Sequence, residues 1–261
     1  MTDRVLEHIG KLLAADTIEE TWSLHCAAMA EFGFDRLLYG FTRFRSHRDL
    51  GQPDDLMVLS NHTPAYLEAF IHGGLYQNAP MVRWAAENVG VCSWGWLKEN
   101  QASFTDEERR IIALNIDHGI KAGYTISFPE VSRRNKGAIG LVAPIGTPQH
   151  EVEDIWARDG SAIRMLNEIF HLKATSLPYT SVSLLTARQR EVLEWVGDGK
   201  TTQDIAAILG VSTATIEKHL RLAREALNVG TTAQAVLTAT YKNQIFIAPR
   251  PGQAARTVTR E

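Results

Sequence analysis

The feature that most constrains the fold of this chain is an interruption of its regular sequence pattern at residues 173–183, KATSLPYTSVS. Serine, threonine and proline dominate the segment, and no sustained helical period runs through it. We therefore interpret it as an interdomain linker. It divides the 261 residues into a domain at 1–172 and a smaller domain at 184–247, followed by a disordered tail at 248–261. Each domain is long enough to bury a core of its own.

The composition is that of an ordinary globular protein, with 44% hydrophobic and 22% charged residues. No apolar run approaches the roughly 18 residues that a membrane span needs, and charges interrupt the apolar residues from the N-terminus onward. We expect neither a signal peptide nor contact with a membrane. Cys26 and Cys92 are too few and too far apart for a disulfide framework or a paired zinc site. A reducing cytoplasm is the expected compartment.

The net charge of −3 is unevenly distributed along the chain. Residues 177–247 carry seven Lys or Arg against six Asp or Glu, and residues 248–261 add three Arg against one Glu. The N-terminal part therefore has a net charge of −6, and a positively charged C-terminal part follows it in the sequence. This asymmetry agrees with a nucleic-acid-binding C-terminal end, although a charge of this size is no proof of one.

The first domain mixes helical and strand patterns. A capping-box pattern at Thr17 begins a helix that Gly33 ends, and residues 34–44 alternate as a strand. Three residues share one face of this strand: Leu38, Gly40 and Thr42. The same signals predict strands at 57–59, 92–94, 124–128 and 138–143, and helices at 64–71, 80–88, 105–119 and 151–172. We predict an α+β fold, an α-β-α sandwich around a mostly antiparallel sheet.

The second domain reads as four short helices and no strand. A capping box at Thr186 begins the first helix, and we expect Thr202 to cap the second, which Gly210 ends. Ser212 caps the third helix at 213–226, and the fourth covers residues 232–241. Two short helices joined by a turn of three or four residues that contains glycine are typical of a helix-turn-helix, whose second helix enters the major groove.

The third of these helices has a polar face suited to DNA. Its apolar residues recur at helical spacing and face inward: Ile216, Leu220, Ala223 and Leu227. The opposite face presents Thr213, Ala214, Glu217, Lys218 and Arg221. Arg221 suits a guanine or a phosphate, Glu217 suits the amino group of cytosine, and Lys218 with Lys200 suits phosphates. On a lone helix these would be ordinary solvated charges, but the four-helix context favours double-stranded operator DNA as a partner.

A series of residues in the second domain resembles the LuxR-type helix-turn-helix. The matching residues are Leu185-Thr186, Glu191-Val192-Leu193, Gly199-Lys200-Thr201, Ile205-Ala206, Val211-Ser212, Thr215-Ile216, Lys218-His219-Leu220 and Leu227. Gln189 stands where that family usually has Glu, Glu217 where a basic residue is common, and residues 231–233 read TTA instead of Asn-Arg-Thr. The departure at Glu217 means that a relative's operator sequence cannot be carried over to this chain.

The LuxR-type helix-turn-helix occurs in regulators that respond to different signals, and the first domain indicates which signal applies here. A phosphoreceiver needs an acidic pair after its first strand and a β-α alternation, which this chain lacks. Its pattern instead resembles the autoinducer-binding domain of LuxR-type regulators, which binds N-acyl homoserine lactones. The marks are Gly33-Phe34, Leu38, Gly40, Tyr66, Phe70, Pro80, Trp94, Gly119-Ile120, Gly123 and Thr125. We expect a ligand site formed by Leu38, Gly40, Thr42, Tyr66, Phe70, Ala79, Trp94, Ile120, Thr125, Ser127 and Gly140.

The departures from that domain fall on its polar ligand contacts. Tyr66 replaces a Trp and keeps a hydrogen-bond donor, whereas Phe70 replaces a Tyr and loses a hydroxyl. Ala79 stands where the family has the Asp that accepts from the ligand amide. A buried amide left unpaired costs roughly 1–3 kcal/mol. Either another residue accepts it, with Asn78, Thr125 and Ser127 as candidates, or the ligand is a metabolite other than a lactone.

The resemblance implies a cytoplasmic, homodimeric transcription regulator of quorum sensing. An N-acyl homoserine lactone or a similar amphipathic signal is the expected effector, with no cofactor and no metal. Operator DNA is the expected partner, with RNA polymerase as a further candidate. We expect an activator, but the sequence leaves open whether ligand promotes or releases DNA binding. An enzyme acting on its ligand is the rival class, and we find no nucleophile–base pair, metal set or phosphate loop for it.

Overall fold

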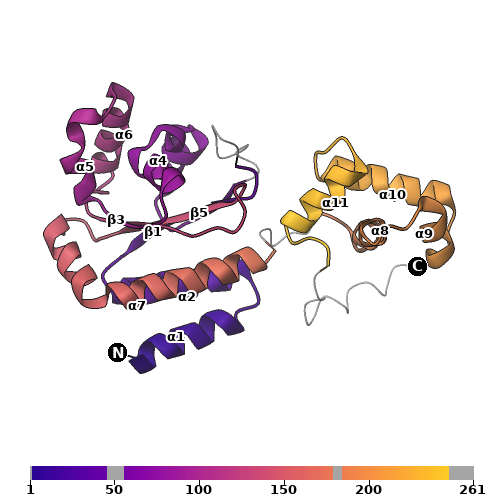
Figure 1. Ribbon diagram of the computed structural model, residues 1–261, viewed down its shortest axis with the longest axis horizontal. Helices are drawn as coiled ribbons and strands as arrows, with labels where there is room; N and C mark the ends of the chain where they lie inside the picture. Colours follow the sequence, from indigo (N-terminus) through magenta and orange to yellow (C-terminus); the bar gives the residue numbers. More distant parts are fainter. Residues whose placement is uncertain (1, 46–55, 179–183, 247–261) are drawn as a thin grey trace. The chain divides into compact units, whose positions relative to one another are not determined.

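The computed structural model describes residues 2–45, 56–178 and 184–246 (Figure 1). The chain forms two compact units, one made of residues 1–15 and 19–174 and the other of 16–18 and 175–261. The predicted disordered tail at 248–261 and the second half of the predicted linker lie outside the described residues.

The first unit is built on a five-stranded sheet with the order β2-β1-β5-β4-β3. Every pairing between neighbouring strands in it is antiparallel. The strands are β1 Arg36–Thr42, β2 Met57–Ser60, β3 Gly90–Ser93, β4 Gly123–Ser127 and β5 Lys136–Val142. The predicted α+β class and the antiparallel sheet are confirmed.

Helices cover both faces of this sheet (Figure 1). Helices α2 Ile18–Glu31 and α7 Gln149–Ser176 lie on one face, and α1 Thr2–Ala14 packs outside them. The other face carries α4 Pro80–Glu87, α5 Gly95–Glu99 and α6 Asp106–Asp117. Shorter helical segments complete the unit: α3 Pro64–Leu67, the π-helix η2 Glu68–His72 and the 3-10 segments η3 Leu75–Asn78 and η4 Gln101–Ser103. The predicted α-β-α sandwich is therefore confirmed.

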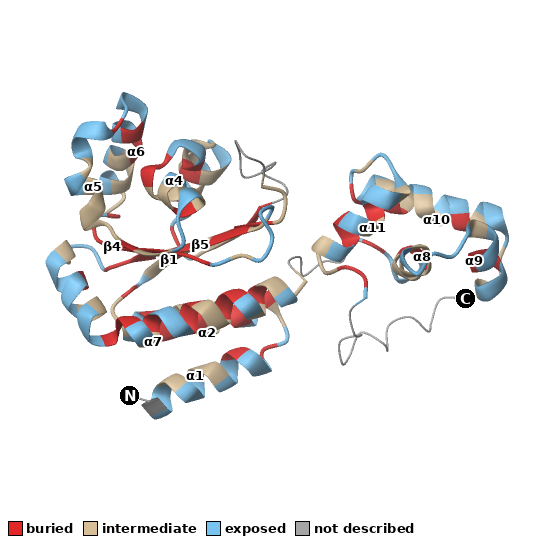
Figure 2. Cartoon of the chain, viewed as in Figure 1, coloured by how far each residue is buried: buried red, intermediate tan, exposed pale blue. Residues whose placement is uncertain are grey.

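The two faces of β1 pack differently, as its alternation predicts. Leu37, Tyr39 and Phe41 are buried, and the ring of Tyr39 meets Phe170 of α7 edge-on at 5.1 Å. Phe170 in turn stacks on His25 of α2 with ring centroids 4.1 Å apart. Buried residues follow the sheet and the inner faces of these two helices in Figure 2. This side is a packed core, which leaves the opposite face of β1 for a cavity.

Three predicted elements in the first unit differ from the structure, two of them in their bounds and one in helix type. The strand predicted at 92–94 ends at Ser93, and Trp94 adopts the helical conformation that begins α5. The helix predicted at 64–71 changes into the π-helix η2 after Leu67. Helix α7 continues to Ser176, past the predicted end at residue 172, because Ala174 on its last turns is fully buried.

The second unit is the predicted bundle of four helices, α8 Ala187–Gly197, α9 Thr202–Leu209, α10 Thr213–Ala226 and α11 Thr232–Tyr241. Helices α8, α9 and α10 meet at three fully buried residues, Val192, Ile205 and Ile216. The expected cap of α9 is wrong by one residue, because Thr201 forms the capping box with Asp204. Gly210 ends α9 in the left-handed conformation, with φ of 66°, which a residue without Cβ adopts readily. Residues 210–212 form the turn to α10.

Candidate functional site

A cavity of about 840 Å³ lies between the sheet and the helices of its second face. Strands β1, β4 and β5 form its floor, and α3 to α6 with the short segments between them supply its walls. The residues predicted for a ligand site that line it are Leu38, Gly40, Thr42, Tyr66, Phe70, Ala79, Trp94, Ile120, Thr125 and Gly140. Their role in binding stays a prediction, but the fold brings them to one place.

Ser127, the other predicted site residue, does not line this cavity. Its Oγ lies 2.8 Å from the carbonyl oxygen of Ala85 and 2.7 Å from that of Asn88, so it holds the end of α4 against β4. Asn78, one of the candidate acceptors, is exposed and donates to Glu107 outside the cavity. Strand alternation places Ser127 on the same face as Thr125, but helix α4 covers that end of the face. These two residues are therefore no substitutes for the missing acceptor at position 79.

Small residues keep the cavity floor open. Gly40 pairs with Ala138 across β1 and β5, and Leu38 pairs with Gly140, which pairs with Thr125 on β4. A Cβ atom added to Gly40 would meet no atom within 4 Å. The floor therefore offers a long apolar surface with free space above its centre.

Two aromatic residues at the cavity already use their hydrogen-bond donors inside the protein. The indole Nε1 of Trp94 donates to Oγ1 of Thr125 over 2.9 Å, and the hydroxyl of Tyr66 donates to Oδ1 of Asn115 over 3.0 Å. Burial raises the pKa of Tyr66, so this hydroxyl keeps its proton. Because Trp94 donates to it, Thr125 retains its own hydroxyl proton for a ligand.

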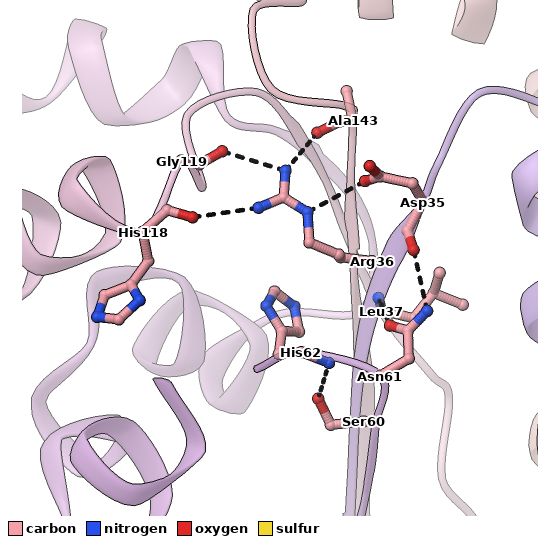
Figure 3. A network of polar contacts seen from close by, with 9 residues as sticks. All are labelled: Asp35, Arg36, Leu37, Ser60, Asn61, His62, His118, Gly119 and Ala143. Carbon is pink, nitrogen blue, oxygen red and sulfur yellow. Dashed lines mark hydrogen bonds and ion pairs between the residues drawn. The ribbon is translucent and has the colours of Figure 1, made fainter. Parts of the chain in front are cut away.

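Arg36 ties together three segments near Tyr66 (Figure 3). Its guanidinium donates to the carbonyl oxygens of His118, Gly119 and Ala143, and its Nε donates to Asp35. Gly119 ends α6 with φ of 71°, which turns those carbonyls toward Arg36. The network fixes the segment that runs from α6 to β4.

His62 lies next to this network and also lines the cavity. Its ring lies 4.9 Å from that of Tyr66, which stacks on Phe70 at 5.1 Å. Burial and then the charge of Arg36 lower the pKa of His62 to about 4. The imidazole is therefore neutral at physiological pH.

Helix α10 presents the predicted polar face in the second unit. Ile216 and Ala223 are fully buried and Leu227 nearly so, whereas Leu220 is partly buried against them. The residues predicted to contact DNA are all exposed: Lys200, Thr213, Ala214, Glu217, Lys218 and Arg221. Arg221 Nη1 lies 2.6 Å from Oε1 of Glu225, one turn further along the helix. An exposed pair of this kind is weak enough to open toward another anion.

Two family models match the two units. The autoinducer binding domain matches residues 17–174, and the model of bacterial regulatory proteins of the luxR family matches residues 183–239. The chain belongs to the LuxR family of transcriptional regulators. Proteins of this family regulate transcription and are not enzymes, which removes the rival reading of the first domain.

Relatives of this LuxR-family regulator cover most of its length. The transcriptional activator protein ExpR of Dickeya dadantii is 26% identical over 183 residues, 65% of this chain and 70% of its own. The transcriptional activator protein AnoR of Acinetobacter nosocomialis is 23% identical over 236 residues, 88% of this chain and 94% of its own.

Two solved structures share the fold. The structure of CepR2 from Burkholderia cenocepacia, described as an N-acylhomoserine lactone dependent LuxR family factor, has a TM-score of 0.51 at 19% identity. It covers 65% of this chain and 93% of its own. Escherichia coli SdiA has a TM-score of 0.52 at 16% identity and covers 94% of this chain and 99% of its own.

The cavity of this LuxR-family regulator also contains polar residues that the sequence analysis missed. Tyr76 lines it, and its buried hydroxyl has no hydrogen-bond partner among the described residues. Lys136 lines it and is only 8% exposed. The alternation of β5 could have placed Lys136 at the cavity, because Lys136 shares a face of the strand with Ala138 and Gly140. No local pattern in the sequence places Tyr76 there.

Neither a metal site nor a membrane span occurs in the part of the chain that the structure describes. Residues 2–45, 56–178 and 184–246 contain no group of three or more His, Cys, Asp or Glu that could hold a metal ion. No helix among them is long and apolar enough to cross a bilayer.

Proposed function

We propose that this protein is a ligand-responsive regulator that binds a small amphipathic molecule in its first unit and operator DNA through α10. One observation carries the proposal: a large cavity with an open apolar floor lies inside the domain that matches the autoinducer-binding family. Burying a ligand there stabilises the domain by mass action, since the ligand binds the folded state alone.

The first candidate ligand is an N-acyl homoserine lactone. The family match, the apolar floor and the presence of Trp94 at the cavity support it. Thr125 supplies one hydroxyl donor beside Trp94. An acyl chain would lie over Gly40, where an added Cβ atom meets no atom within 4 Å, and would run beside the indole of Trp94, which lies over Gly140.

The second candidate is an amphipathic metabolite without a lactone amide. Ala79 favours it, because its methyl group cannot accept a hydrogen bond from an amide. The placement of Asn78 and Ser127 strengthens this point, since neither replaces the lost acceptor.

DNA binding follows from the helix-turn-helix match and the exposed face of α10. We propose that α10 enters the major groove, that the protein acts in the cytoplasm as a homodimer on two half-sites, and that RNA polymerase is a further partner. An exposed apolar pair on α7 supports the dimer: Met165 is 53% and Leu172 is 68% exposed, seven residues apart on one helical face.

A thermal-shift series tests the ligand. Purified full-length protein is melted with N-acyl homoserine lactones that differ in acyl length, and we expect a rise in melting temperature that depends on chain length. Fluorescence anisotropy with selected duplexes then shows whether bound ligand raises or lowers DNA affinity.

The variant Ala79→Asp separates the two candidates. It restores an acceptor, so it should improve lactone affinity about tenfold or more if an amide binds there. Wild type that melts unchanged with every lactone, together with an Ala79→Asp variant that gains nothing, would reject the lactone and leave the second candidate.

A further inference from the structure

The cavity contains a buried positive charge that forms no ion pair with a carboxylate of the described residues. Lys136 begins β5 and faces the cavity on the same side as Ala138 and Gly140. It is 8% exposed, and its Nζ donates to the carbonyl oxygen of Asn88 over 2.8 Å. Across the described ranges no acidic side chain forms an ion pair with it. Among the residues that the structure describes, two of the three ammonium donors have no acceptor.

Burying a charged ammonium group without a counter-ion costs free energy, which is why the pKa of Lys136 is lowered. Burial lowers the pKa of Lys136, the charge of Arg45 lowers it further, and Glu130 opposes both. Glu130 does not serve as its direct partner, because its Oε1 lies 3.1 Å from Nε2 of His171. An anion placed in the cavity would relieve this cost.

Support of α4 is not a sufficient reason for a lysine at this position. Asn88 follows the last residue of α4, and its carbonyl oxygen already lies 2.7 Å from the hydroxyl of Ser127. An apolar side chain at position 136 would avoid burying the charge, and the single proton of the Ser127 hydroxyl would be available to that carbonyl oxygen in place of the one of Ala85. The charge therefore indicates a partner in the cavity.

Thr42 supplies a second donor beside Lys136. The two residues are direct partners in the register of β1 and β5, so their side chains leave the sheet on the same face. Thr42 is 1% exposed and lines the same cavity. Its Oγ1 accepts from the backbone N–H of Phe44 over 3.0 Å, which leaves the hydroxyl proton free to be donated.

This donor pair lies far from the other polar contacts of the cavity floor. Thr125, which accepts a hydrogen bond from Trp94, pairs with Gly140. Gly140 lies four positions beyond Lys136 on β5, about 13 Å along the strand. Ala138 and Gly40 form the floor between them. We propose that Lys136 and Thr42 form a subsite for a carboxylate at one end of an elongated apolar ligand. The inference rests on the proposed function, namely that the cavity binds a small molecule.

Two probes with the same ten-carbon chain test the subsite, decanoate and 1-decanol. Isothermal titration of the full-length protein should give at least about tenfold tighter binding of decanoate, because only decanoate can pair with the ammonium. Lys136→Met should abolish this preference and Thr42→Val should reduce it. Lys121→Met is the matched control, since Lys121 also lines the cavity but is exposed. Lys136→Arg keeps a charge and should retain the preference.

Equal binding of both probes by wild type, or a preference that survives in Lys136→Met, would overturn the subsite. Binding of lactones without any binding of decanoate would also overturn it, while the proposed function would stand. If no lactone and neither probe binds, the cavity is not a small-molecule site and both proposals fail. Melting temperatures of the unliganded variants establish whether each variant is folded. If Lys136→Met does not fold, the preference for decanoate is compared between Lys136→Arg, which should keep it, and Thr42→Val, which should reduce it.

Discussion

The indole N–H of Trp94 donates to the hydroxyl of Thr125, so two residues that resemble ligand contacts in the sequence are already bonded to each other. Trp94 begins α5 and Thr125 lies in the centre of β4, so this bond joins a helix to the cavity floor. Because the indole has a single N–H, Trp94 cannot donate to a ligand unless the bond to Thr125 opens. A ligand would receive the Thr125 proton instead.

Replacing Thr125 by Val should therefore destabilise the protein before any ligand is added. The variant leaves the Trp94 N–H without its acceptor, at a cost of about 1–3 kcal/mol in the free energy of unfolding. Urea unfolding followed by tryptophan fluorescence measures this cost. Thr125→Ser keeps the hydroxyl and should lie close to wild type. Equal stability of the Val and Ser variants would show that the bond contributes nothing.

Replacing Gly40 by Leu should reduce the length of the acyl chain that the cavity can accept. A Cβ at Gly40 meets nothing within 4 Å, and its backbone is not in the left-handed region, so the side chain enters free space without strain. The unliganded protein should melt no lower than wild type, because a glycine is removed from a strand interior. In a lactone series, the thermal shift of long acyl chains should disappear before that of short ones. An unchanged length preference would place the chain elsewhere, and Gly40→Ala is the mild control.

The cavity floor could be predicted because strand alternation is a local property. Leu38, Gly40 and Thr42 follow one another on one face of β1, and pairing with β5 adds Gly140 to that face. Capping is equally local, so the predicted box at Thr186 is present, and Thr105 forms another at the start of α6. These features depend on residues within a few positions of one another.

The rest of the site depends on packing between distant segments. Ser127 lies on the cavity face of β4, yet the end of α4 takes its hydroxyl. Trp94 was expected in an extended segment, but its bond to Thr125 and the start of α5 determine where it lies. The orphaned hydroxyl of Tyr76 is visible only once every possible partner has been placed. No local pattern of the sequence contains this information.

Stability should fall as the pH decreases through the range in which unfolded histidine gains its proton. The folded pKa of His62 is about 4, lowered first by burial, against an ordinary value of 6.5. Between these values the unfolded state binds more protons, so the stabilisation is complete above pH 6.5 and is lost progressively toward pH 4. His62 alone accounts for roughly 3 kcal/mol of this change.

Urea unfolding between pH 4 and pH 7.5 measures this dependence, and His62→Gln, which does not titrate, should reduce its slope. The slope should not vanish, because burial also lowers the pKa of His25, to about 3. A variant with the full wild-type slope would show that His62 does not contribute to it.

Replacing Arg221 by Ala should weaken operator binding by about 1–3 kcal/mol if its guanidinium reads a base. Arg221 is exposed on α10 and paired with Glu225, so the free protein should lose little stability from the change. Duplexes selected from a random library supply the operator, and fluorescence anisotropy measures affinity for it and for single-base variants. Loss of discrimination at one base pair identifies base reading, whereas an equal loss on all duplexes identifies a phosphate contact. Glu225→Gln is the matched control: it releases Arg221 from its ion pair and should bind DNA at least as tightly as wild type. Unchanged affinity in Arg221→Ala would remove this residue from the interface.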